Sequence, residues 1–125
     1  MNTIRSKEYS IFIQNGEFAN FDYSIYSRIG ILVDTNTKKY CLPILLNKVS
    51  ALEEACIIEI SPGEENKDIN SCLNIWKSLL NNKFDQRSLL INLGGGLIGD
   101  IGGFVASTYK RGIDFLQIPS SLVAM

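Results

Sequence analysis

The chain has 125 residues, of which 46% are apolar and 20% are charged, and its formal net charge is −1. This balance is typical of one globular domain with its own core, and the scattered lysines and arginines form no basic field that would attract nucleic acid or an anionic membrane. The sequence shows no signal peptide and no apolar run long enough to span a membrane, so we expect a cytoplasmic protein.

The chain contains three cysteines and no histidine. Cys41, Cys56 and Cys72 lack the spacing of a redox pair or a zinc site, and we interpret them as buried apolar residues. The absence of imidazole excludes a Ser-His-Asp triad and argues against a catalytic zinc site within these residues.

Apolar runs bounded by turn residues predict strands that alternate with helices. The strands are expected at residues 9–13, 29–33, 55–60, 88–93 and 115–118. The helices are expected at residues 38–47, from 68 onward and at 98–109, and Pro43 must interrupt or restart the first of them. This order predicts an α/β fold, a Rossmann-like parallel sheet with helices on both faces, whose ligands bind beyond the carboxyl ends of the strands.

Three helical segments carry more detailed expectations. After residue 68, apolar side chains recur at helical spacing and are expected to face the core: Ile69, Cys72, Leu73, Trp76 and Leu80. In the next helix, Gly102 and Gly103 are expected to permit close packing on the sheet. Ser120 and Ser121 resemble an N-cap for an apolar helix of about one turn, so we interpret the chain as part of a longer protein.

A glycine turn joins the fourth strand to the helix after it. Gly94, Gly95 and Gly96 permit positive φ angles and close approach of a ligand, and the helix directs its free N–H groups toward the turn. The spacing Gly94, Gly96, Gly99 also fits the G-x-G-x-x-G pattern of dinucleotide sites, although it follows the fourth strand instead of the first. The turn therefore predicts a phosphate cradle, with a ligand-free tight turn as the alternative.

Polar segments at four strand ends are expected on the same rim of the sheet. They are Asp34, residues 61–67, residues 94–100 and the Ser120-Ser121 pair. Asp34 closes a buried strand and is placed to accept hydrogen bonds from a ribose. A shared rim makes a ligand site more convincing than the glycine turn alone.

Residues 94–125 closely resemble the signature of the 3-dehydroquinate synthase family, beginning with Gly-Gly-Gly-Leu-Ile-Gly-Asp-Ile-Gly-Gly-Phe. Asp34-Thr35-Asn36 and Pro62-Gly63-Glu64 with Lys67 support the resemblance. It implies an NAD-binding domain over residues 1–125, followed in the family by a helical metal- and substrate-binding domain. It also implies an NAD-dependent, zinc- or cobalt-dependent lyase of the shikimate pathway, a homodimer that converts 3-deoxy-arabino-heptulosonate 7-phosphate to 3-dehydroquinate and phosphate.

The same resemblance assigns roles to particular residues. It implies NAD contacts from Asp34, Asn36, Glu64, Lys67, Gly95, Gly96, Leu97, Asp100, Ser120 and Ser121. Arg111 matches the arginine that the family links to substrate phosphate. The family's metal ligands and substrate lysines follow the stretch that these 125 residues match, so this polypeptide alone is expected neither to bind the metal nor to turn over substrate.

The same residues also fit other interpretations. Asp34 and Asn36 also fit helix caps, Glu64 and Lys67 a surface ion pair, and Asp100 a stabilising acid in a first helical turn. Arg111 also fits a solvated turn. The alternative functions are a related sugar phosphate cyclase that makes an inosose or a valiolone, and a stand-alone nucleotide-binding module.

Overall fold

The computed structural model describes residues 10–12, 17–61 and 69–123. Its strands are β1 (Ser10–Phe12), β2 (Ile29–Asp34), β3 (Cys56–Ile60), β4 (Leu89–Leu93) and β5 (Asp114–Ile118). Its α-helices are α1 (Thr35–Tyr40), α2 (Leu42–Lys48), α3 (Ile69–Asn81), α4 (Gly96–Thr108) and α5 (Ser120–Val123). Short 3-10 turns lie at Glu17–Asn20, Tyr23–Ile25, Ser50–Leu52 and Tyr109–Arg111. Within these ranges, no helix is both long enough and apolar enough to cross a bilayer.

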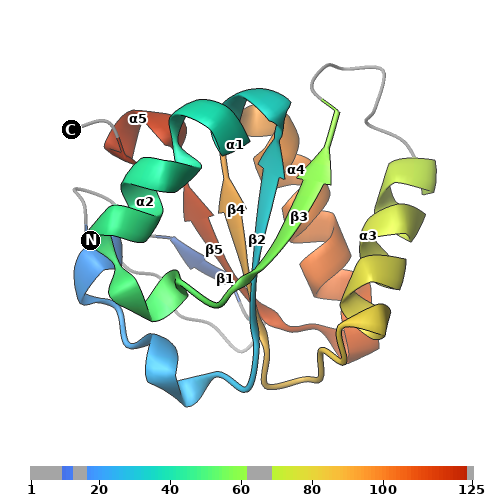
Figure 1. Cartoon of the computed structure of the whole chain (residues 1–125). Helices are drawn as coiled ribbons and strands as arrows, with labels where there is room; N and C mark the ends of the chain where they lie inside the picture. The colour runs from blue at the N-terminus through green and yellow to red at the C-terminus, as the bar shows by residue number, and fades with distance from the viewer. Residues whose placement is uncertain (1–9, 13–16, 62–68, 124–125) are drawn as a thin grey trace.

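The strands form one parallel sheet in the order β1-β5-β4-β2-β3, which confirms the predicted α/β class (Figure 1). Helices cover both faces. On one face, α2 and α5 pack with Ile31 and Val33 of β2, and on the other α3 and α4 pack with Leu32 of the same strand. Because both faces are covered, the central strands are apolar throughout instead of alternating with polar residues.

The expected helix at 38–47 is two helices. Asp34 caps α1, so that helix begins at Thr35, earlier than predicted, and Pro43 lies in the first turn of α2. Proline is tolerated there because the first N–H groups of a helix have no intrahelical partner. The last helix also differs, since α5 begins at Ser120 itself and the serines lie inside its first turn.

The core-facing side of α3 agrees with the prediction only in part, since Cys72 is buried and Trp76 packs against the core. Ile69, Leu73 and Leu80 are exposed by 57%, 41% and 55%. The buried side chains of α3 are Cys72, Ile75 and Leu79. The helix thus carries two adjacent apolar stripes, and periodicity alone could not show which one faces the sheet. The prediction for the cysteines is confirmed only in part, because Cys72 is buried whereas Cys41 and Cys56 are partly exposed.

Candidate functional site

The sheet order creates a topological switch point between β2 and β4. From the carboxyl end of β2 the chain passes to β3 on one side, and from that of β4 it passes to β5 on the other. The helices that follow, α1 and α4, lie near opposite faces of the sheet (Figure 1). In open α/β sheets, such a divergence leaves a crevice in which ligands bind. Asp34 and the glycine turn at residues 94–96 are the two strand ends that meet there.

The three glycines of the turn have different roles. Gly94 has φ +153°, and its N–H donates to the carbonyl of Ile118 at 3.1 Å. A Cβ on Gly94 would lie 2.6 Å from Cδ1 of Ile98, so this position needs glycine for the turn itself. Gly95 is the N-cap of α4 and no side chain caps the helix there. At Gly95 and Gly96, an added Cβ would meet no atom within 4 Å.

This geometry fits a diphosphate. The first N–H groups of α4 have no carbonyl partner within the helix, and the helix dipole places partial positive charge beside them. The backbone at Gly95 and Gly96 faces open space, so an anion can approach those amides without meeting a side chain. The Gly94 amide is already used within the fold, and the cradle therefore consists of the amides that follow it.

Close packing of α4 on the sheet is confirmed. A Cβ on Gly102 would lie 1.9 Å from Oδ1 of Asn92, which projects from β4 beneath the helix. On the neighbouring strand, Gln117 Nε2 donates to the carbonyl of Gly99 at 3.2 Å. Asn92 and Gln117 pair in register across β4 and β5. The helix thus rests its glycines on two side-chain amides, which the sequence interpretation missed.

Asn92 is 1% exposed, and among the described residues neither polar atom of its side chain has a hydrogen-bond partner. An unpaired buried polar group destabilises a fold by about 1–3 kcal/mol. In the sequence, the only sign of this buried amide was a polar residue inside an otherwise apolar strand.

Asp34 has the capping role that was its alternative interpretation. Its Oδ1 accepts from the Thr37 N–H at 2.8 Å, and the Asp34 N–H donates to Thr37 Oγ1 at 3.0 Å. This capping box uses one carboxylate oxygen, so Oδ2 remains as the acceptor suited to a ribose hydroxyl. Asn36 lies exposed in the first turn of α1.

Glu59 of β3 is a site-edge residue that the sequence interpretation missed. Its carboxylate accepts from Thr35 Oγ1 at 3.1 Å and from Lys38 Nζ at 3.0 Å, and both donors belong to α1. The hydrogen bond from Lys38, and to a lesser extent that from Thr35, holds the pKa of Glu59 below its ordinary value. Glu59 thereby ties the first turns of α1 to the edge of the sheet.

Most of the other predicted NAD contacts lie on the same rim. Leu97 is half-buried in the first turn of α4, and Asp100 is exposed one turn further along. Because α4 begins at Gly96, Asp100 lies beyond the first turn, which removes the support for its alternative role as a capping acid. Ser120 and Ser121 follow β5 at the carboxyl edge. Glu64 and Lys67 lie outside the described residues.

Arg111 is not brought together with these residues. It lies between α4 and β5, at the amino edge of the parallel sheet, and is separated from the glycine turn by the length of α4, about 20 Å for 13 residues. It lines a shallow hollow with Arg87 and Lys110. Lys110 and Arg111 have φ angles of +46° and +71°, and Gln86 Nε2 donates to the Lys110 carbonyl at 2.7 Å.

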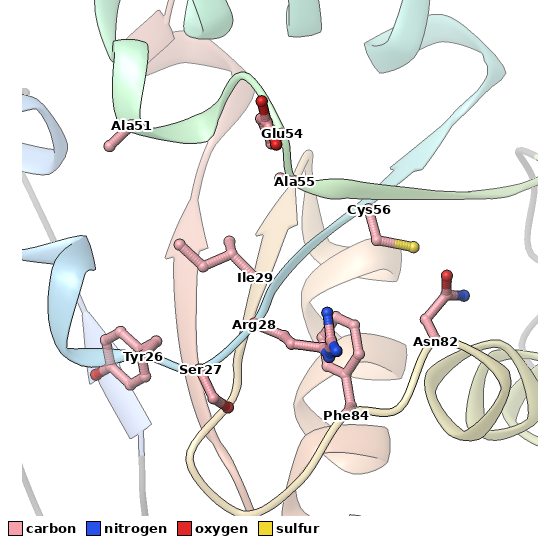
Figure 2. Close-up of a pocket in the computed structure, with 10 residues that line it drawn as sticks. All are labelled: Tyr26, Ser27, Arg28, Ile29, Ala51, Glu54, Ala55, Cys56, Asn82 and Phe84. Atoms are coloured by element: carbon pink, nitrogen blue, oxygen red, sulfur yellow. The ribbon is translucent and has the colours of Figure 1, made fainter.

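A second hollow, of about 430 Å³, opens at the amino ends of β2 and β3 (Figure 2). Its lining includes Arg28, Glu54, Cys56 and Phe84. Arg28 Nε donates to the Lys83 carbonyl at 3.2 Å, and burial raises the pKa of the Cys56 thiol, which makes it a poor nucleophile. This hollow lies at the edge opposite the glycine turn and includes none of the predicted site residues.

The residues present do not fit the family's metal. The sequence has no histidine, and in the part of the chain that the structure describes, no three Cys, Asp or Glu residues gather closely enough to hold an ion. No step that depends on a metal can be derived from these residues.

Comparison with known proteins identifies the family of this chain. A family model described as 3-dehydroquinate synthase N-terminal matches residues 57–125. A 3-dehydroquinate synthase of Parabacteroides distasonis is 44% identical over 99 residues, covering 79% of this chain and 28% of the relative. A 3-dehydroquinate synthase of Campylobacter jejuni is 38% identical over 121 residues, covering 97% of this chain and 33% of the relative. The chain therefore spans about a third of the length of these relatives.

Solved structures share the fold. A 2-deoxy-scyllo-inosose synthase complexed with carbaglucose-6-phosphate, NAD+ and Co2+ has a TM-score of 0.77 at 18% identity, covering 94% of this chain and 35% of that one. A 2-epi-5-epi-valiolone synthase of Streptomyces hygroscopicus subsp. jinggangensis, with NAD+ and Zn2+ bound, has a TM-score of 0.73 at 19% identity, covering 95% and 34%. These likenesses concern the fold alone. Since the family model covers more than half of its length, glycine turn included, the chain belongs to the 3-dehydroquinate synthase family and matches its N-terminal part.

Proposed function

We propose that this chain is the NAD-binding domain of a 3-dehydroquinate synthase, an enzyme that converts 3-deoxy-arabino-heptulosonate 7-phosphate to 3-dehydroquinate and phosphate. The observation that carries the proposal is the open backbone at Gly95 and Gly96, at a helix N-terminus beside the switch point. The family match and the NAD+ bound in two fold neighbours support it.

The chain's residues bind and orient the cofactor. The amides of Gly95, Gly96 and Leu97 hold the diphosphate, and Asp34 Oδ2 with Asn36 holds the adenosine ribose. We propose further NAD contacts from Asp100, Ser120, Ser121, Glu64 and Lys67. Bound NAD supplies a hydride acceptor for a transient oxidation of the substrate.

Arg111 needs a different arrangement from the rest. It lies at the amino edge of the sheet, about 20 Å from the glycine turn at the carboxyl edge. We propose that its phosphate contact is made to the site of a second copy of the chain, in the homodimer that the family resemblance implies. The hollow beside this arginine is lined by the cations Arg87 and Lys110 and also by the carboxylate of Asp85, which offsets part of their positive charge.

The isolated chain is proposed to be inactive. Its described residues offer no metal site, and it spans about a third of its relatives' length, so the remaining groups of the reaction have to come from elsewhere. The relatives at 38–44% identity favour a dehydroquinate synthase, whereas the two cyclase structures named above share only 18–19% identity with this chain. A stand-alone nucleotide-binding module is the second candidate.

The test is an NMR titration of the isotope-labelled 125-residue chain with NAD. We expect saturable shifts of the amide signals of residues 95–97 and of Asp34, and weaker binding of ATP than of NAD. The Gly95→Ala variant should lose about tenfold or more in affinity, because its methyl group enters the cradle. Its fold should persist, since Gly95 has φ −85° and its Cβ meets nothing within 4 Å.

Ser107→Ala is the matched control, because Ser107 is exposed near the other end of the same helix. It should bind NAD as the unmodified chain does. Unchanged signals at residues 95–97 in saturating NAD would rule out the cradle. Equal binding of ATP and NAD would favour the nucleotide-binding module.

A further inference from the structure

Two acidic residues on neighbouring strands hold α1 at the adenosine end of the proposed site. Asp34 ends β2, and Glu59 of β3 pairs in register with Val33, the residue before Asp34. Both carboxylates contact α1, Asp34 through the backbone of Thr37 and Glu59 through Lys38 and Thr35. The first turns of α1 are thus held between two acids.

Lys38 is the cation closest in sequence to the proposed ribose contact. It follows Asp34 by four residues, which places it about one helical turn away on the same side of α1. Its Nζ lies 3.0 Å from Glu59 Oε1, although its side chain is 53% exposed. Lys39, the next residue, is exposed and lies with Nζ 5.3 Å from the ring centroid of Tyr40. Of these two lysines, only Lys38 is paired with an acid of the sheet.

The two common nicotinamide dinucleotides differ by one phosphate on the adenosine ribose. Sites that accept the 2′-hydroxyl place a carboxylate beside it, and sites that accept a 2′-phosphate place a cation there. A carboxylate near that phosphate repels it, and a cation that already pairs with a carboxylate attracts it less. Asp34 provides the carboxylate that suits a 2′-hydroxyl. Lys38 is the cation that could bind a 2′-phosphate, but it is already paired with Glu59.

We propose that the Glu59–Lys38 ion pair is a specificity determinant that makes this site reject a 2′-phosphorylated dinucleotide. This inference rests on the proposed NAD site. Glu59 does not touch the cofactor in this arrangement. It acts by holding Lys38 and by adding negative charge on the strand that neighbours Asp34.

The experiment compares the affinities of the 125-residue chain for NAD and NADP by NMR titration, with no activity measurement. The unmodified chain is expected to bind NADP at least tenfold more weakly than NAD. Glu59→Gln should tighten NADP binding about tenfold, because one charge is removed and Lys38 is released. NAD affinity should change less than twofold. Glutamine retains an acceptor for Thr35, so α1 should stay in place.

Two double variants identify the cation responsible. Adding Lys38→Met to Glu59→Gln should abolish the gain in NADP affinity, whereas adding Lys39→Met should leave it. All variants should keep the circular dichroism spectrum and melting temperature of the parent, since the three substituted side chains are exposed.

The outcomes separate this inference from the proposed function. If the unmodified chain binds NAD but Glu59→Gln leaves the NADP to NAD ratio unchanged, the ion pair has no such role and the cofactor site stands. The same conclusion follows if NADP binds the unmodified chain as tightly as NAD, or if Lys39→Met removes the gain as fully as Lys38→Met. If neither dinucleotide binds, the proposed site and this inference both fail.

Discussion

Glycines at the start and in the middle of α4 have opposite surroundings. At Gly95 and Gly96, an added Cβ would meet nothing within 4 Å, whereas at Gly102 it would lie 1.9 Å from Asn92 Oδ1. Gly95 and Gly96 expose the main chain to a ligand, whereas Gly102 lets the helix approach the sheet. Substitution of Gly95 or Gly96 should therefore affect binding, and substitution of Gly102 should affect folding.

The glycines of the dinucleotide motif, Gly94, Gly96 and Gly99, do not all belong to the group that is open to a ligand. Of its three glycines, Gly94 and Gly99 have close neighbours, with an added Cβ 2.6 Å from Ile98 Cδ1 and 3.3 Å from Gln117 Oε1 respectively. Only Gly96 is open, and its open neighbour Gly95 stands between the motif positions. The motif spacing thus reports largely on how the turn and the helix pack, and only partly on what the turn binds.

The largest effect on stability is expected for Gly102→Ala. The added methyl group overlaps a buried amide between helix and strand, and we expect a loss of about 3 kcal/mol or more in the free energy of unfolding. Urea denaturation followed by circular dichroism measures it.

The double variant Gly102→Ala/Asn92→Ala tests the cause. Removing the Asn92 amide makes room for the methyl group and eliminates two unpaired polar atoms, so stability should return to within about 1 kcal/mol of the parent. If the double variant is as unstable as Gly102→Ala, the contact with Asn92 does not explain the loss.

Gly94→Ala should be the next most severe. The residue would have to keep φ +153° and displace the Ile98 side chain, so a loss of about 1–3 kcal/mol is expected. Thermal unfolding measures the change, with Ser107→Ala as the control on the same helix. A melting temperature equal to that of the control would mean that the turn can adopt another geometry.

Local patterns predicted the strands and the glycine turn because those features are encoded by neighbouring residues. Apolar runs bounded by turn residues located all five strands, with ends that differ by at most one residue within the described ranges. The start of α4 was missed by two residues, because glycines have low helix propensity and only packing on the sheet makes Gly96 helical.

The parts that failed depend on contacts between distant residues. Glu59 binds α1 across 21 and 24 positions of sequence, and Gln117 bonds Gly99 across 18, so no local pattern contains either interaction. The position of Arg111 is different. A residue just before a strand of a parallel sheet lies at the amino edge, and topology alone would have separated it from the carboxyl-edge site.

A smaller loss is expected for Gln117→Met, which probes the closed part of α4 with a side chain of similar length. Methionine preserves the length of the side chain but removes the bond from Nε2 to the Gly99 carbonyl, which is 3.2 Å long. A loss of about 1 kcal/mol in unfolding free energy is expected. Denaturant unfolding tests this, and an unchanged midpoint would show that the bond contributes nothing to holding α4.

The smallest effect on stability is expected for Gly96→Ala, and its sign should be opposite. Alanine is the better helix former, and its Cβ at this position meets nothing within 4 Å, so stability should rise by up to about 1 kcal/mol. NAD affinity should nevertheless fall, because the methyl group stands beside the amides that receive the diphosphate. Melting temperature and NMR titration on the same sample separate the two effects. A stabilised variant that binds NAD unchanged would mean that the cofactor does not use the open space at this glycine.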